Sequence, residues 1–240
     1  MLGMKPPVEP SPVPWSTREV WLGLVGIALW GGAFVALRAG AAYLPFQLDP
    51  GLIISLGELL LLVPVWFLAM RKYRVNWAGL GLRPFPPPAV GLGCGLMTLS
   101  FLFNFIYGLI LGLFGQRIQV DLVPVFAGLE SPWLLLLGGA VIAPLVEEIF
   151  FRGFIFAGLA PRFGWQRAAL ISAFIFALVH LSLTALLPIF ILGYIFALLY
   201  YLSGSLWPAI FMHILTNSLA LGAAYLVANA EQFGLSLSLF

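Results

Sequence analysis

The chain has 240 residues, of which 62% are hydrophobic and only 8% are charged, and its mean hydropathy is +1.07. This balance excludes an ordinary soluble domain, in which about 25% of residues are charged. The formal net charge of +2 comes from few residues that cluster at the ends of apolar segments. It therefore reports orientation in a membrane and not nucleic-acid binding.

The chain begins with a proline-rich stretch that contains Pro6, Pro7, Pro10, Pro12 and Pro14. This composition favours an extended tail over a packed element, so we expect a cytoplasmic tail over residues 1–19. The apolar run that follows is too long for the hydrophobic region of a signal peptide and lacks an obvious cleavage site. We therefore expect it to remain as a spanning helix, and residues 20–240 to form a single transmembrane domain.

Apolar runs of about 20 residues, the length that crosses roughly 30 Å of hydrocarbon, recur along the chain. Backbone polar groups must be satisfied internally at that depth, so the spans should be helices. The predicted fold class is all-α, a polytopic transmembrane bundle of seven or eight helices with an intramembrane polar cavity. The seven predicted spans are 20–43, 51–70, 88–114, 132–160, 168–186, 187–202 and 206–229. An eighth, short or re-entrant segment would lie in "DLVPVFAGL", residues 121–129.

Positive charges predict the orientation of this bundle. If the N-terminus is cytoplasmic, the outer segments hold only Arg117, whereas the inner segments hold eight basic residues. These are Lys5, Arg18, Arg71, Lys72, Arg74, Arg83, Arg162 and Arg167. A cytoplasmic N-terminus without a targeting signal suits a bacterial inner membrane, and an organelle membrane is the alternative.

Five charged residues remain inside the predicted spans, and each needs a partner or a function there. They are Arg38, Glu58, Glu147, Glu148 and Arg152. Arg38 and Glu58 lie in neighbouring spans, where a structural pair is one interpretation. Glu148 and Arg152 are four residues apart and share a helix face, so they can pair. Glu147 lies about 100° round the helix with no local partner, which makes it a candidate functional residue.

The two histidines of the chain, His180 and His213, also lie in apolar segments. Phe176 shares a helix face with His180, and Asn217 shares one with His213, because each pair is four residues apart. The rise per residue puts Glu147 and His180 at ~20 and ~18 Å from the inner ends of their helices, and His213 at ~10 Å. Helix tilt could bring these side chains into one polar cavity. Each residue taken singly is also consistent with structural hydrogen bonding between helices.

Three patterns resemble the motifs of the CAAX prenyl endopeptidase and bacteriocin-processing (CPBP) family of intramembrane proteases. They are "EEIFFR", "FALVH" and "HILTN", in this order and in separate hydrophobic segments. The resemblance, which is to type II CAAX endopeptidases, covers a core at about 90–230. It implies hydrolysis of peptide bonds in membrane-associated or prenylated, CAAX-like substrates, and it does not choose among them.

The resemblance also implies roles for the motif residues. Glu147 and His180 would orient and deprotonate a water molecule. His213 and Asn217 would donate hydrogen bonds to the developing oxyanion. The residues expected to brace the site are Glu148, Arg152 and Phe176. The expected partners are membrane lipid and a membrane-associated peptide or protein.

Other interpretations stay open at this point. Glu147, His180 and His213 could bind zinc, and the family has been described as metalloproteases. We favour a mechanism that requires no cofactor, because the chain lacks a His-Glu-x-x-His motif and because Asn217 suits oxyanion binding. The alternative functions are a proton-coupled transporter, whose Glu and His residues relay protons, and a non-catalytic membrane scaffold.

Overall fold

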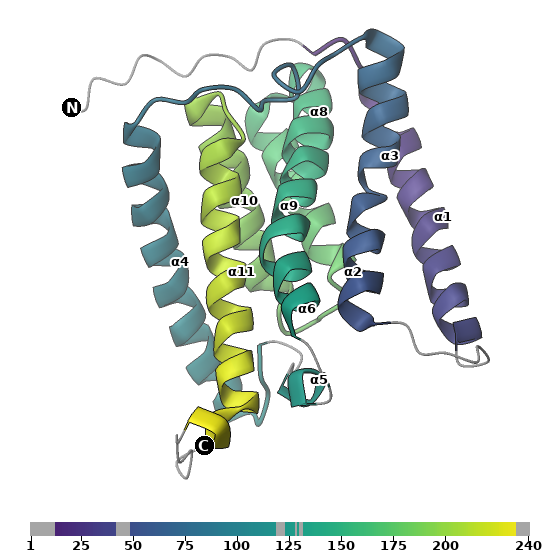
Figure 1. Cartoon of the computed structure of the whole chain (residues 1–240). Helices are drawn as coiled ribbons and strands as arrows, with labels where there is room; N and C mark the ends of the chain where they lie inside the picture. Colours follow the sequence, from purple (N-terminus) through teal and green to yellow (C-terminus); the bar gives the residue numbers. More distant parts are fainter. Residues whose placement is uncertain (1–12, 42–48, 119–122, 128, 130–131, 234–240) are drawn as a thin grey trace.

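The computed structural model describes residues 13–41, 49–118, 123–127, 129 and 132–233, and in these ranges it contains helices and no strands. Figure 1 shows the long helices side by side as one bundle. The first half consists of α1 (Thr17–Ala41), α2 (Pro50–Leu59), α3 (Leu62–Val65), the π-helix η1 (Trp66–Arg71), α4 (Pro88–Leu113) and α5 (Val123–Ala127). The second half consists of α6 (Trp133–Leu137), π-helix η2 (Gly138–Ile142), α7 (Ala143–Glu148), π-helix η3 (Ile149–Phe156), α8 (Ala157–Phe163), α9 (Trp165–Val179), α10 (Leu186–Ser203), α11 (Trp207–Ala228) and the 3₁₀ turn η4 (Ala230–Phe233).

The all-α transmembrane prediction is confirmed, and the seven predicted spans correspond to seven helical segments. Among the described residues, five segments are long and apolar enough to cross a membrane. They are Gly51–Arg71, Pro88–Leu113, Trp133–Phe163, Leu186–Ser203 and Trp207–Ala228. The other two are α1, with 25 residues, and α9, with 15. The eighth candidate, at 121–129, is represented in the described residues by α5, whose five residues cannot span a bilayer.

The predicted end of the fifth span, residue 186, is wrong. Helix α9 ends at Val179, and Leu181 follows with a positive φ of 52°. The break lies in an apolar sequence with few polar groups: the Ala185 amide donates to the Ser182 hydroxyl at 3.3 Å, and the Thr184 hydroxyl donates to the distant Ile118 carbonyl at 2.9 Å. At 1.5 Å per residue α9 is about 22 Å long, shorter than the hydrocarbon layer. Its last residues therefore lie at membrane depth.

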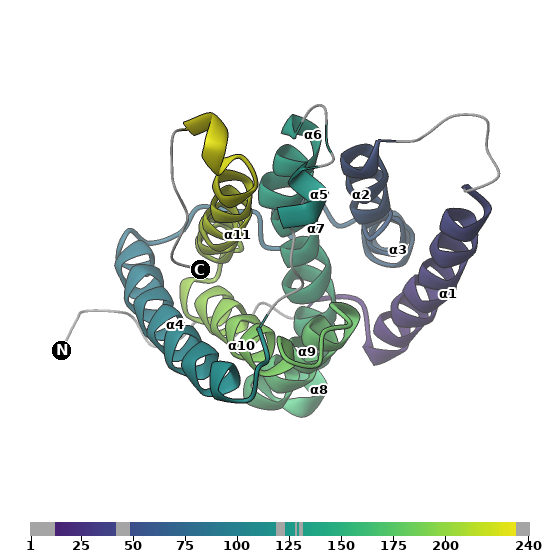
Figure 2. The same cartoon turned by 90° about the horizontal axis from the view of Figure 1, so that it is seen from below.

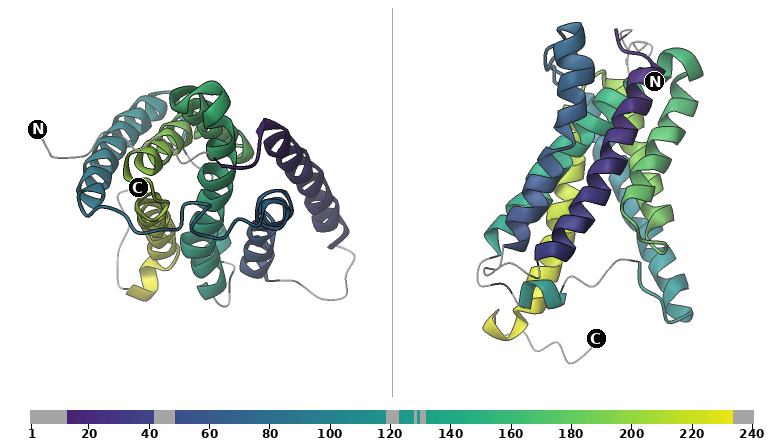
Figure 3. Two further views of the ribbon diagram at one scale, coloured as in Figure 1. Left: turned by 90° about the horizontal axis from the view of Figure 1, so that it is seen from above. Right: turned by 90° about the vertical axis from the view of Figure 1, so that its right-hand side faces the viewer.

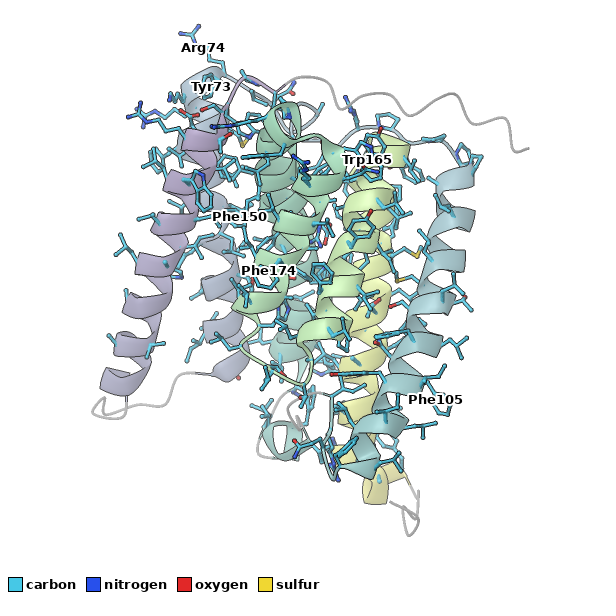
Figure 4. All side chains as sticks on the ribbon, turned by 180° about the vertical axis from the view of Figure 1, so that it is seen from behind. Tyr73, Arg74, Phe105, Phe150, Trp165 and Phe174 are labelled. Atoms are coloured by element: carbon cyan, nitrogen blue, oxygen red, sulfur yellow. The ribbon has the colours of Figure 1, made fainter. Side chains whose placement is uncertain are left out.

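The helix that runs from α6 to α8 is the centre of the bundle. Seen along the helix axes, α7 lies between α11 and α2, while α1 and α4 stand at opposite sides (Figures 2 and 3). On the central helix, the side chains of Phe150, Phe151, Phe154 and Phe156 are all buried. On outer helices the apolar side chains face outward instead, as Phe105 does on α4 (Figure 4). This inverted pattern is what lipid-facing helices require.

The start of α1 is fixed to this central helix. Trp15, which lies in the part predicted as a tail, is buried, and its Nε1 donates to the Phe154 carbonyl at 2.9 Å. Residues 1–12 of the predicted tail lie outside the described residues. Ser16 and Glu19 form a capping box, since the Ser16 amide donates to Glu19 Oε2 at 2.8 Å.

Glu19, which precedes the predicted first span, also accepts a hydrogen bond from Lys72 at 2.6 Å. Burial alone would raise the pKa of this carboxyl group. The hydrogen bonds from Lys72 and Ser16 together outweigh burial and hold the pKa well below its usual range. The carboxylate therefore ties the start of α1 to the end of η1.

Candidate active site

Four ionisable side chains meet in the core where the central helix contacts α11. Glu147 and Glu148 are the last residues of α7, Arg152 lies in η3, and His213 lies on α11. Glu148 and Arg152 are completely buried, and Glu147 and His213 are nearly so. Both π-helices that flank α7 widen the helix next to these residues, and such π segments frequently accompany functional sites.

Glu148 holds two of these groups with one oxygen. Its Oε1 accepts from Arg152 Nη1 at 2.8 Å and lies 2.9 Å from His213 Nδ1. The other terminal nitrogen of Arg152 donates to the Gly193 carbonyl on α10 at 2.9 Å, and the guanidinium lies 4.4 Å from the centroid of the Phe176 ring. The predicted Glu148–Arg152 pair is thus present. It also ties the central helix to α10 and α11, which local spacing could not reveal.

Glu147 has a partner that comes from a different helix. Its Oε2 lies 3.4 Å from His213 Nε2, and this oxygen has no hydrogen-bond partner among the described residues. Because His213 Nδ1 faces the carboxylate of Glu148, Nδ1 is the nitrogen that carries a proton. Nε2 is then the nitrogen that can exchange a proton beside Glu147. With His213 protonated, the two acids, Arg152 and His213 have no net charge.

His180 stands at the end of α9 and not inside a helix as predicted. Its Nδ1 lies 2.7 Å from the Phe176 carbonyl, and a carbonyl only accepts, so Nδ1 bears the proton and Nε2 a lone pair. The Phe176 ring lies between the imidazoles, with centroids 4.7 Å from His180 and 5.7 Å from His213. Within the described chain, Glu147 forms its imidazole contact below 4.0 Å with His213 and not with His180.

Asn217 compensates for a backbone hydrogen-bond donor that is missing from the central helix. Its Nδ2 donates to the Gly139 carbonyl in η2 at 2.9 Å. In this widened turn the Ala143 amide bonds to Gly138, five residues back, so the next donor in the pattern would be Pro144, which has no N–H. Asn217 supplies the donor that Pro144 lacks. One N–H of its amide is therefore engaged, and the other remains for a further acceptor.

The acidic residue that sequence reasoning left out of the site is Glu58. Helix α2 packs against η2 and α7, which brings Glu58 close enough to Glu147 for their charges to interact. The predicted pairing of Glu58 with Arg38 lies outside the described side chains. The signal was present in the sequence, since any acid at membrane depth is a functional candidate. What was missing was the contact between α2 and the central helix.

The described donor groups do not form a metal site. Across the described ranges no three His, Cys, Asp or Glu side chains come close enough together to hold an ion. Of the three alternative zinc ligands, Glu147 and His213 are adjacent, whereas neither of them forms a contact below 4.0 Å with His180 among the described residues. This arrangement does not fit three-ligand coordination.

A comparison with known protein families gives a match over this part of the chain. Residues 129–219 match the family described as type II CAAX prenyl endopeptidase Rce1-like. This part of the chain is therefore similar to the Rce1-like family. The Rce1-like region runs from α6 into α11 and contains all three sequence motifs.

A curated relative gives a second match. Over 85 residues the chain is 36% identical to the protein named "Putative membrane peptidase YdiL" of Bacillus subtilis (strain 168). The matched stretch covers 35% of this chain and 35% of that relative, so the chain spans about a third of the length of the curated relative it matches. No solved structure matches the chain.

Proposed function

We propose that this multi-pass membrane protein is an intramembrane endopeptidase in which Glu147 activates water. The observation that carries the proposal is the 3.4 Å contact between Glu147 Oε2 and His213 Nε2. A carboxylate at membrane depth has been placed against an imidazole whose other nitrogen is fixed by Glu148. Preorganised acid and base groups in a site shielded from water are what general acid–base catalysis requires.

In the proposed reaction Glu147 takes a proton from water, and the hydroxide oxygen attacks the carbonyl carbon of the substrate. His180 Nε2, which has a lone pair, helps to orient that water. Protonated His213, through Nε2, and the second N–H of Asn217 stabilise the oxyanion. When the C–N bond breaks, Glu147 passes its proton to the leaving amine, which balances the reaction.

The surroundings of the site support electrostatic catalysis. Phe196 stacks on His213 with ring centroids 4.8 Å apart, and the Phe176 ring separates the two imidazoles. Charged groups interact more strongly among apolar side chains than in water. Glu148 and Arg152 hold His213 in place and balance its charge.

The substrates that we propose are peptide bonds of membrane-associated proteins, including prenylated, CAAX-like ones. Two findings support this class: the family match is to prenyl endopeptidases, and the relative is named as a membrane peptidase. A location in a bacterial inner membrane with a cytoplasmic N-terminus is part of the proposal. It rests on the eight basic residues of the inner segments.

A comparison of membrane peptides in two cell strains tests this function. One strain carries the wild-type chain and the other carries Glu147→Gln, and we expect specific cleavage products only in the first. Glu19→Gln is the matched control, because it makes the same chemical change in an acid at the end of the bundle, away from the site. Equal cleavage by the Glu147→Gln strain would contradict the proposal. So would proton or solute flux in proteoliposomes that depends on Glu147 without peptide cleavage.

A further inference from the structure

A hollow between the start of α1 and the end of α8 combines two arginines with an apolar wall. Its volume is about 410 Å³. The residues that line it are Thr17, Arg18, Trp21, Leu22, Val25 and Arg162. The two helices meet at the end of the bundle where most of the lysines and arginines lie, on the side from which the chain enters α1 (Figures 1 and 3).

Within the part of the chain that the structure describes, no acidic side chain neutralises the positive charges of this hollow. Among the described residues, neither Arg18 nor Arg162 forms an ion pair, and Arg162 lies over the Phe163 ring at 5.5 Å. The nearest acid in the sequence, Glu19, is engaged by Ser16 and Lys72. Two guanidinium groups therefore face the hollow with their hydrogen-bond donors available. Guanidinium groups bind phosphate oxygens through paired hydrogen bonds, which favours a phosphate as the ligand.

The apolar part of the hollow continues down α1 from the arginine. Positions 18, 21, 22 and 25 share one face of the helix, and the last three are about half exposed. They extend about 10 Å along the helix axis, in the direction of the membrane interior. Leu22 also lines a second hollow of about 510 Å³ between α1 and α3, whose lining is apolar. Such an apolar wall does not stabilise a soluble anion, whereas it can pack against an acyl chain.

We propose that Arg18 and Arg162 bind the phosphate of an anionic phospholipid whose acyl chain lies along Trp21 and Leu22. Tryptophan is the side chain that prefers the level of lipid headgroups, and basic pockets between spanning helices suit anionic headgroups. The site is independent of the proposed peptidase reaction. Bound lipid would fill the space between α1 and the central helix and hold α1 against it.

The test is the binding of phosphatidylglycerol to purified protein, measured by native mass spectrometry. The variant Arg18→Gln with Arg162→Gln is compared with Arg74→Gln plus Arg167→Gln. The control pair removes the same charge at the same end of the bundle but outside the hollow; Arg74 projects beyond that end (Figure 4). We expect at least about a tenfold loss of phosphatidylglycerol affinity in the first variant, as removal of charge-assisted hydrogen bonds would give.

Three results would overturn the proposal. Equal losses in both variants would show that charge at this end, and not the hollow, attracts the lipid. Equal binding of phosphatidylcholine and phosphatidylglycerol would show that no anionic headgroup is selected. Displacement of bound phosphatidylglycerol by inorganic phosphate at similar concentration would identify a small-anion site. Size-exclusion profiles that match wild type verify that each variant is folded. The variant Arg18→Lys with Arg162→Lys should retain lipid better than the glutamine variant, because the positive charge is kept.

Discussion

The hydrogen bond from Asn217 to the Gly139 carbonyl gives a quantitative prediction. Asn217→Leu keeps the branched shape and the number of heavy atoms of the side chain but leaves the partly buried Gly139 carbonyl without a donor. An unsatisfied buried carbonyl costs about 1–3 kcal/mol. Hydrogen bonds between membrane helices are worth about 0.6–2 kcal/mol, so we expect a loss of about 1–2 kcal/mol in the free energy of unfolding.

The cause can be isolated because the missing donor is known. In Pro144→Ala the backbone regains an N–H five residues after Gly139, where the π-helical pattern places the donor for that carbonyl. Asn217→Leu should therefore cost about 1 kcal/mol less in a Pro144→Ala background than in wild type. The free energy of unfolding of the four proteins is measured in bicelles by steric trapping.

Asn229→Leu is the matched control, since Asn229 donates within its own helix end, to the Tyr225 carbonyl at 2.9 Å. Its effect should add to that of Pro144→Ala, because the two sites share no partner. If Asn217→Leu and Pro144→Ala also add to within about 0.5 kcal/mol, the account of the orphaned carbonyl is refuted.

Three further predictions concern stability. Glu148→Gln leaves Arg152 buried without a counter-charge and should lower the free energy of unfolding by about 3–5 kcal/mol. The double change Glu148→Gln, Arg152→Met should recover part of this loss. No recovery would argue against the pair. Trp15→Ala removes a buried side chain and should cost about 3–5 kcal/mol, whereas a cost under about 1 kcal/mol would show that the start of α1 is not packed. The pKa of Glu19 is lower when folded than unfolded, so its stabilisation is present above the unfolded value of about 4.3 and is lost as pH falls toward the folded value. The stability difference between wild type and Glu19→Gln should accordingly shrink in acid, and a difference that grows below about pH 4 would refute the assignment.

Much of the fold could be predicted because membrane insertion leaves a strong local record. Long apolar runs predict helices wherever backbone groups must be satisfied without water, and the seven segments follow from that rule alone. The break after Val179 was missed because its polar groups are few and the sequence remains apolar across the turn. One of its hydrogen bonds, from Thr184 to the Ile118 carbonyl, joins segments far apart in the sequence, so spacing does not encode it. The π-helices were missed because no composition marks a widened turn.

The candidate site could be predicted in its members but not in its pairings. The i, i+4 spacing of Glu148 and Arg152 encodes their contact directly. The contacts of His213 with both glutamates, of Asn217 with Gly139, and the approach of Glu58 depend on how α2 and α11 pack on the central helix. Spacing within one helix carries no information on that packing.

The central claim, that the carboxyl group of residue 147 moves the proton of the attacking water, is tested most directly by one rate. The kcat of purified wild-type protein on a peptide substrate found in the strain comparison is set against that of Glu147→Gln, with both proteins shown to unfold with equal free energy. Loss of a general base lowers a rate by about 10²–10⁴-fold, and the account predicts a loss of that size. A Glu147→Gln protein that retains more than about a tenth of the wild-type kcat would contradict it.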